Sequence, residues 1–126
     1  SPMTETLHTD RAPKAIGPYA QAIKANGFLF TSGQLGIDPA TGALEDGIEK
    51  QTHAAMKNLG AILETAGCGF GSVVKTTIFL ADLKDFSAVN AIYESYFDAA
   101  FPARSCFQVA QLPKGGLVEI ECIAAL

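Results

Sequence analysis

The residues with the clearest chemical potential lie close together near the C-terminus. Arg104 follows Phe101–Pro102–Ala103, and Glu119 lies on the next apolar stretch, beyond a turn that contains proline and glycine. A guanidinium keeps its charge at every accessible pH and binds a carboxylate with two parallel hydrogen bonds. A glutamate close to it can take up or release a proton. Together the two side chains predict a pocket for a small carboxylic acid that undergoes proton transfer.

Each of these two residues also has a plainer interpretation. Arg104 can equally form a surface or interface salt bridge, and the residues alone leave the two roles evenly matched. Glu119 and Glu121 alternate with apolar residues, which places both carboxylates on one face of a strand. A solvated strand face is the expected role for at least one of them.

Cys106 lies two positions after Arg104 and suggests nucleophilic catalysis. A nucleophilic cysteine normally has a histidine base beside it. The chain has 2 histidines, His8 in the N-terminal segment and His53 on the first predicted helix, and we expect both at the surface. We therefore predict that Cys106 forms a wall of the pocket rather than a covalent intermediate.

Other candidate site residues stand at predicted element ends. Tyr19 follows Gly17–Pro18, a rigid turn that can place a phenol over a cavity or leave a half-buried aromatic at the surface. Ser32 and Gly33 end a predicted strand, where glycine lets backbone N–H groups approach a ligand, although the pair is also ordinary turn chemistry. Asn90 lies on the apolar side of the second predicted helix, so it is either a structural anchor or a pocket wall.

The elements that must position these residues follow from apolar periodicity and turn signals. A first helix is predicted from a capping box at Asp46 and Glu49 to a glycine stop at Gly67. A second helix is predicted from Asp85 to about Ala99. Strands are predicted at Thr6–Thr9, Phe28–Ser32, Val73–Leu80, Ser105–Leu112 and Leu117–Ala125.

The order of these elements predicts an α+β layer fold, with two helices on one face of a mixed β-sheet. We expect the last two strands to form a hairpin around Pro113–Gly116, with Glu119 opposite Val109. Arg104 would then lie about 16 Å further along the strand. In that register the two charges would meet only across the subunit interface of a rotational oligomer.

The composition predicts one domain over residues 1–126, and Ser1–Pro2 ahead of Met3 can be a cloning remnant. Hydrophobic residues make up 48% of the chain and charged residues 17%. No apolar run reaches the roughly 18 residues of a spanning helix, and the N-terminus does not resemble a signal peptide. The apolar excess therefore predicts a subunit interface rather than a membrane segment.

Charge and cysteine usage narrow the class of protein further. The net charge is −4 and the sequence pI about 5.0, without a basic stripe, which argues against a nucleic-acid partner. The three cysteines, Cys68, Cys106 and Cys122, are widely spaced, so they indicate neither a disulfide framework nor a zinc site. This usage is typical of a reducing compartment and predicts a cytoplasmic protein.

Several segments, in order along the chain, resemble the Rid family, the YjgF-like reactive-intermediate deaminases. They are Ala15–Tyr19, Thr31–Gln34, Ala81–Leu83, Val89–Tyr93 and the C-terminal stretch 102–124. The resemblance extends from about residue 11 to the C-terminus. It implies a chorismate-mutase-like protomer, assembled as a homotrimer with its sites at the subunit interfaces.

The resemblance also implies an activity, the hydrolytic deamination of short 2-enamine and 2-imine acids to 2-keto acids and ammonia. Examples are 2-aminoacrylate and 2-aminocrotonate (2-iminobutanoate), and neither a metal nor an organic cofactor is implied. Arg104 would hold the substrate carboxylate, and Glu119, selected by its place in the motif, would position the attacking water. The substrate site would also include Tyr19, Ser32, Gly33, Asn90 and Cys106.

Two other functions stay open from the sequence. One is the binding or sensing of small keto or amino acids without turnover. The other is endoribonuclease or translation-inhibitor activity, described for some family members, against which the acidic pI argues. Phe107 is bulkier than the small aliphatic residue expected after Cys106, so the preferred substrate side chain is also left open.

Overall fold

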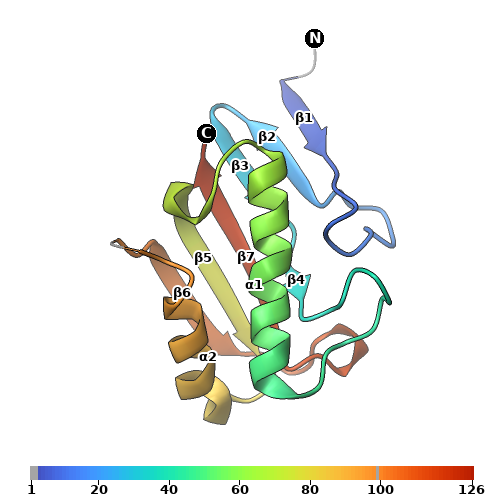
Figure 1. Cartoon of the computed structure of the whole chain (residues 1–126), viewed down its shortest axis with the longest axis vertical. Helices are drawn as coiled ribbons and strands as arrows, with labels where there is room; N and C mark the ends of the chain where they lie inside the picture. The colour runs from blue at the N-terminus through green and yellow to red at the C-terminus, as the bar shows by residue number, and fades with distance from the viewer. Residues whose placement is uncertain (1–2, 99) are drawn as a thin grey trace.

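One mixed sheet carries both helices on the same face in the computed structural model, which describes residues 3–98 and 100–126 (Figure 1). The strands are β1 (Thr4–Leu7), β2 (Ala22–Ala25), β3 (Phe28–Thr31), β4 (Gln34–Leu35), β5 (Val73–Leu80), β6 (Ala103–Gln108) and β7 (Val118–Ala125). The helices are α1 (Gly47–Thr65) and α2 (Phe86–Glu94), with 3₁₀ turns η1 (Phe70–Ser72), η2 (Leu83–Asp85) and η3 (Pro113–Gly115). Ser1–Pro2 and the expected helix end at Ala99 lie outside the described residues.

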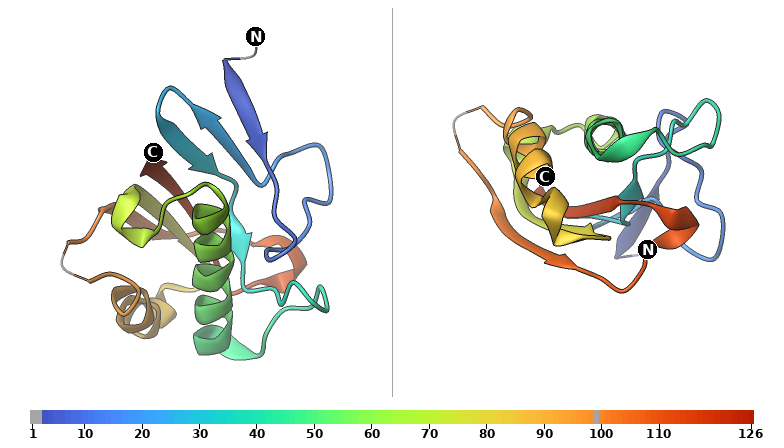
Figure 2. Two further views of the ribbon diagram at one scale, coloured as in Figure 1. Left: turned by 45° about the horizontal axis from the view of Figure 1, so that its top comes forward. Right: turned by 90° about the horizontal axis from the view of Figure 1, so that it is seen from below.

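The sheet runs in the order β1-β2-β3-β7-β5-β6, and the short strand β4 also pairs with β7. Seen from below in Figure 2, both helices lie on one side of the curved sheet and leave its other face without a covering layer. The α+β prediction of two helices on one face of a mixed sheet is confirmed. No helix in the described part of the chain is long and apolar enough to cross a membrane.

Helix α1 forms much as its sequence predicts. Ala55, Leu59 and Ile62 recur at helical spacing and are at most 1% exposed against the sheet. Gly67 ends the helix with a φ of +83°, a conformation that glycine adopts without steric cost. The predicted capping box is wrong in one respect, because the Asp46 side chain makes no capping hydrogen bond.

Helix α2 is shorter than predicted and ends at Glu94. The apolar residues that suggested a longer helix still enter the core, but the backbone has left the helix by then. Phe97 packs against Tyr93 and Phe70, with ring centroids 4.9 and 5.6 Å apart. Apolar spacing here marks which side chains are buried, and it does not require helical backbone.

The structure also contains a hairpin that the prediction omitted. Strands β2 and β3 are joined at Asn26 and Gly27, which both have positive φ, 50° and 80°. These angles are typical of a type I′ turn, for which Asn-Gly is the strongest short signal. Three of the four residues of strand β2 are alanine or lysine, which have weak strand propensity, so its pairing comes from the turn and from tertiary contacts.

The predicted C-terminal hairpin is wrong. Strand β6 pairs in parallel with β5, and β5 lies between β6 and β7. The physical reason is the β5-α2-β6 order, a βαβ crossover that returns the chain parallel to β5. The expected pairing of Glu119 with Val109 is therefore replaced by pairing of Glu119 with Phe79.

Candidate functional site

The larger pocket of interest, here called the Glu119 pocket, has a volume of about 860 Å³. Its walls come from the loop between β1 and β2, the end of β3, the turns after β4, η3 and β7. The residues able to bind a ligand or move a proton are Lys14, Tyr19, Ser32, Gly33, Gln34, Thr41, Lys114, Glu119 and Glu121. Four predicted site residues therefore share one pocket: Tyr19, Ser32, Gly33 and Glu119.

Glu119 is held by a strand at the centre of the sheet. Its backbone pairs with Leu35 of β4 on one side and with Phe79 of β5 on the other. Burial raises the pKa of its carboxyl above the usual range, and the neighbouring Glu121 carboxylate raises it further. The site therefore contains a carboxyl group that binds a proton more readily than an exposed glutamate does.

Gly33 allows the Glu119 carboxylate to lie against the backbone. A Cβ atom added at Gly33 would come within 2.8 Å of both Cδ and Oε2 of Glu119. This separation is closer than real Cβ contacts, so any side chain at position 33 has to displace the carboxylate. Glycine here is a requirement of close approach.

Ser32 is oriented by two hydrogen bonds. Its hydroxyl donates to the carbonyl oxygen of Ala20 at 2.6 Å, and its backbone N–H donates to the carbonyl oxygen of Gln21 at 2.9 Å. The Ser32 oxygen therefore keeps only its lone pairs for a ligand. Tyr19 lies on the β1–β2 loop with its side chain half exposed at the same pocket.

A second, smaller pocket of about 390 Å³, here called the Arg104 pocket, lies between α2 and the start of β6. Arg104 donates from Nη1 to Oδ1 of Asn90 at 2.6 Å. Its guanidinium carbon lies 5.2 Å from the ring centroid of Tyr93 and 5.5 Å from that of Phe86. The structure thus brings together two predicted site residues, Arg104 and Asn90, and supports the guanidinium with two rings.

The two pockets lie on opposite faces of the sheet. Arg104 contacts α2 and therefore points to the helix side, whereas Glu119 alternates with residues buried under α1, Val118 and Ile120 among them, and points to the other side. Arg104 pairs with Thr76 of β5, and Thr76 pairs with Cys122 of β7, which is three residues from Glu119. Two strand spacings and three residue rises separate their Cα atoms by roughly 14 Å.

Cys106 lies on the same face of β6 as Arg104 but lines neither pocket of the protomer. It is partly buried against the core. Burial raises the pKa of its thiol, an effect that the Arg104 charge partly offsets. A thiol in this state is largely protonated at neutral pH and is a weak nucleophile.

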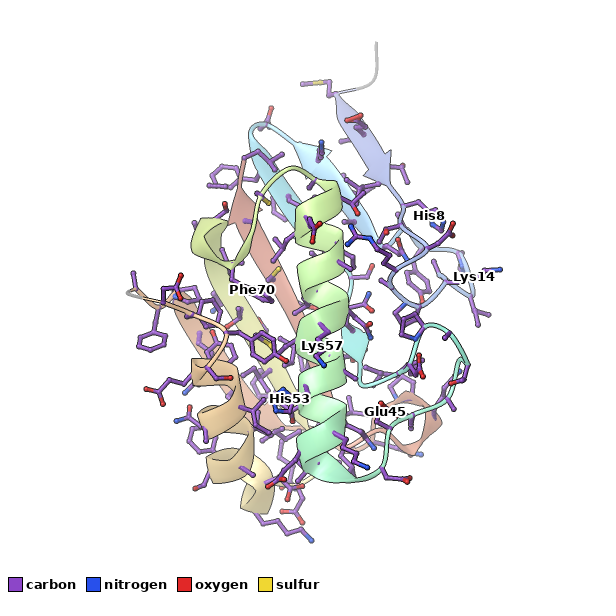
Figure 3. The ribbon with its side chains drawn as sticks, viewed as in Figure 1. His8, Lys14, Glu45, His53, Lys57 and Phe70 are labelled. Carbon is purple, nitrogen blue, oxygen red and sulfur yellow. The ribbon has the colours of Figure 1, made fainter. Side chains whose placement is uncertain are left out.

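The two histidines are exposed and lie outside both pockets, as predicted (Figure 3). His53 makes a hydrogen bond of 2.8 Å from Nδ1 to the Tyr96 hydroxyl, which links α1 to the segment after α2. His8 lies near the start of the β1–β2 loop, where its Nε2 is 3.0 Å from Asp10. Neither can serve Cys106 as a base in this arrangement.

Sequence reasoning missed the aromatic support of Arg104 and the second carboxylate of the Glu119 pocket. Phe86 and Tyr93 stand four positions before and three after Asn90, so helical spacing put all three on one face, but it indicated only core packing. A solvated strand face was expected for at least one of Glu119 and Glu121, yet both line the Glu119 pocket. The alternation of Glu121 with Glu119 on β7 was the available signal.

Comparison with known proteins agrees with this fold and with the family resemblance of the sequence. Residues 9–126 match the family model described as Endoribonuclease L-PSP. A RutC family protein of Synechocystis is 57% identical over 123 residues, covering 95% of each chain. The goat 2-iminobutanoate/2-iminopropanoate deaminase is 54% identical over 119 residues, covering 94% of this chain and 87% of the relative.

Solved structures show the same relationship. The crystal structure of Escherichia coli TdcF with bound serine superposes with a TM-score of 0.94 at 42% identity, covering 97% of this chain and 98% of that one. The α+β architecture is thus shared over essentially the whole length. The chain belongs to the Rid (YjgF-like) family.

Proposed function

We propose that this protein hydrolyses short 2-imino and 2-enamino acids, among them 2-iminobutanoate and 2-iminopropanoate, to 2-keto acids and ammonia. The observation that carries the proposal is the 54% identity, over 94% of the chain, to a deaminase named for these two substrates. The chain also holds a guanidinium and a carboxyl of raised pKa, which this chemistry needs. Such imines hydrolyse in water unaided, so orientation and one proton relay are sufficient.

Arg104 binds the substrate carboxylate in this proposal. Its Nη1 is engaged by Asn90, while its other N–H groups have no hydrogen-bond partner within residues 3–98 and 100–126. A planar guanidinium with a free edge fits a carboxylate with two parallel hydrogen bonds. Serine, the ligand named in the TdcF structure, is also a small 2-amino acid with a carboxylate.

Glu119 moves the protons of hydrolysis. Its ionised form accepts a proton from water while the water oxygen bonds to C2 and the C=N electron pair passes to nitrogen. The resulting carbinolamine then loses its nitrogen, after protonation, as ammonia, and the C2 hydroxyl gives up its proton to become the keto oxygen. One water is consumed, and the raised pKa of Glu119 suits a group that takes and returns protons near neutral pH.

The amino end of the substrate is assigned to the neighbours of Glu119. Ser32 offers a lone pair to the substrate N–H, because its own proton is engaged by Ala20. Gly33 lets the Glu119 carboxylate lie against the backbone at this end of the pocket. Tyr19 is placed over the pocket, and Cys106 is placed as a wall on the Arg104 side.

The two pockets are proposed to form one site in a homotrimer. Within one protomer Arg104 and Glu119 face away from each other, so one small substrate cannot contact both. Three rings on the face without helices are 41–45% exposed: Phe28, Phe30 and Phe107. Rotational packing of these faces would bury the rings and place Glu119 at the interface. Arg104 lies on the edge strand β6, so it would approach Glu119 of the next subunit around that edge.

The compartment is a further part of the proposal. Three free thiols, at Cys68, Cys106 and Cys122, fit the reducing cytoplasm. Cytoplasmic localisation would also place the protein beside dehydratases that release 2-imino acids from serine and threonine. Fluorescent-fusion imaging in the source cell tests this placement, and an extracellular signal would contradict it.

An ammonia-release assay coupled to a threonine dehydratase tests the activity. The wild-type protein should accelerate ammonia release above the spontaneous rate, and Arg104→Ala and Glu119→Gln should abolish the acceleration. Glu64→Gln is the matched control, because it removes an exposed charge on α1 that is paired with Arg11, and it should behave as wild type. Absence of acceleration together with calorimetric binding of 2-oxobutanoate would favour a binding protein without turnover.

Light scattering behind size exclusion tests the assembly. The expected mass is three times 13.2 kDa. A monomer at micromolar concentration would refute the shared site.

A further inference from the structure

We infer that Tyr93 is a positioning residue, which orients the Arg104 guanidinium for a substrate carboxylate. The inference rests on the proposed function and explains how the Arg104 side chain is held in one orientation. The guanidinium carbon lies over the Tyr93 ring at 5.2 Å, within the range of an attractive cation–π contact. Phe86 contributes a second ring at 5.5 Å.

The Tyr93 ring is itself held in place. The residue is 3% exposed, and its hydroxyl lies 2.7 Å from Oγ1 of Thr76, which is also buried. Thr76 is the β5 residue paired directly with Arg104 in the parallel register. The ring that supports the guanidinium is therefore anchored to the strand neighbour of the arginine that it supports.

Three contacts together define the plane of the guanidinium. The rings of Tyr93 and Phe86 contact it through their π-systems, and Asn90 accepts from Nη1. Arg104 is otherwise an exposed residue on an edge strand. A long exposed side chain would have to be ordered when the ligand arrives, and ordering it beforehand removes that cost from binding.

The neutral state of Tyr93 fits this role. Burial raises the pKa of its hydroxyl, while the bond to Thr76 and the charge of Arg104 lower it by less. The phenol therefore stays protonated through the physiological range, and the ring presents its π-face rather than a phenolate charge. A guanidinium keeps its charge in proteins, so this contact is insensitive to pH near neutrality.

The alternative to positioning is that Tyr93 only stabilises the core, and the experiment has to distinguish the two roles. Tyr93 also packs against Phe97, so its loss affects the core. Phe97→Leu removes a ring from the same cluster without touching Arg104 and is the matched control. Phe86 is 37% exposed, so Phe86→Leu removes the second ring at little cost to folding.

Steady-state kinetics on 2-iminobutanoate provide the first test. Tyr93→Leu should raise KM roughly five- to thirtyfold with a much smaller change in kcat, the range of a partly desolvated cation–π contact. Phe86→Leu should raise KM by less, and Tyr93→Phe, which keeps the ring, should restore wild-type KM to within about twofold. The inference is overturned if folded Tyr93→Leu and Phe86→Leu keep the wild-type KM, or if Phe97→Leu raises KM equally.

A readout without turnover separates this inference from the proposed function. The Nε–Hε NMR signal of Arg104, assigned by its loss in Arg104→Lys, should report an ordered side chain in the wild type and a mobile one in Tyr93→Leu. Failure of the wild type to release ammonia would refute the proposed function, while an ordered signal lost in Tyr93→Leu would still support positioning. An equally ordered signal in both proteins would refute it.

Discussion

The Glu119 pocket and the Arg104 pocket hold opposite charges, and different kinds of groups surround the two charged side chains. Around Glu119 it places backbone, apolar strand neighbours and a second carboxylate, which together raise the pKa of the group. Around Arg104 it places two rings and an amide oxygen, which direct the guanidinium without altering its charge. Under the proposed function, the group that changes protonation lies where ionisation is costly, and the group that binds the carboxylate lies where its direction is restricted.

Mixed assembly of two inactive variants tests most directly whether the two pockets form one site. Arg104→Ala and Glu119→Gln should each be inactive alone, because each removes one half of every site. In trimers assembled at random from equal amounts, about one site in four should receive an intact Arg104 and an intact Glu119 from neighbouring subunits. Activity near a quarter of wild type supports the shared site. No recovery, in mixed trimers verified by native mass spectrometry, would place both residues in one protomer's site.

Replacing the planar guanidinium by an ammonium group of the same charge should also lower activity. Arg104→Lys keeps the positive charge but loses the planar fork, the ring stacking and one charged hydrogen bond. We expect a fall in kcat/KM of roughly ten- to hundredfold, corresponding to about 1.5–3 kcal/mol. Wild-type kcat/KM in the lysine variant would show that direction is unimportant in this pocket.

Gly33→Ala tests the placement of the carboxylate on the other side. The added Cβ displaces the Glu119 carboxylate, a flexible group, so stability should change little while activity falls by about tenfold or more. Gly69→Ala is the control, because a Cβ there meets nothing within 4 Å. Equal activity of the two variants, compared by kcat at matched melting temperature, would contradict the role assigned to Gly33.

The pH dependence of activity and stability should report on the Glu119 pocket and not on the Arg104 pocket. Since burial and then Glu121 raise the pKa of Glu119, the acid limb of kcat should lie above the usual glutamate range, and Glu121→Gln should move it to lower pH. The same raised pKa means that the contribution of Glu119 to stability is fully present below its unfolded pKa and is lost as pH rises through its folded pKa. Glu119→Gln should therefore weaken the fall of the melting temperature as pH rises above the usual glutamate range. An unmoved limb in Glu121→Gln would remove Glu121 from the site.

Cys106→Ala should have the smallest effect. The raised pKa keeps the thiol protonated, and no histidine lies beside it, so activity should stay within about threefold of wild type. Complete loss in a folded protein, with a covalent adduct found by mass spectrometry, would assign Cys106 a nucleophilic role instead.

The parts of the fold that local sequence controls were predictable. Helix α1 follows from apolar spacing and Gly67, and β5 was predicted to the residue as Val73–Leu80. Strand partners were not predictable in the same way, because pairing is decided by segments far apart in the chain. The βαβ crossover that places β6 beside β5 could have been inferred from element order, whereas the two residues of β4 are too few to show a period.

The candidate site was likewise predictable only in part. Residue types and motif positions selected Arg104 and Glu119, but not the contacts that give each its properties. The bond between Arg104 and Asn90, and the rings of Phe86 and Tyr93, arise only when α2 docks beside β6. The closeness of Gly33 to Glu119 likewise depends on where β3 ends relative to β7.

The placement of Arg104 and Glu119 on opposite faces has a consequence for dosage. Under the proposed assembly a lone chain carries two half-sites and no complete one, so specific activity is governed by mass action among chains. Diluting the protein below the concentration at which the assembly dissociates should abolish activity without any inhibitor. Raising its expression in that range should increase the rate of deamination more than proportionally. The sheet separates the two charges within a chain, and under the proposed assembly the concentration of the chain therefore controls its activity.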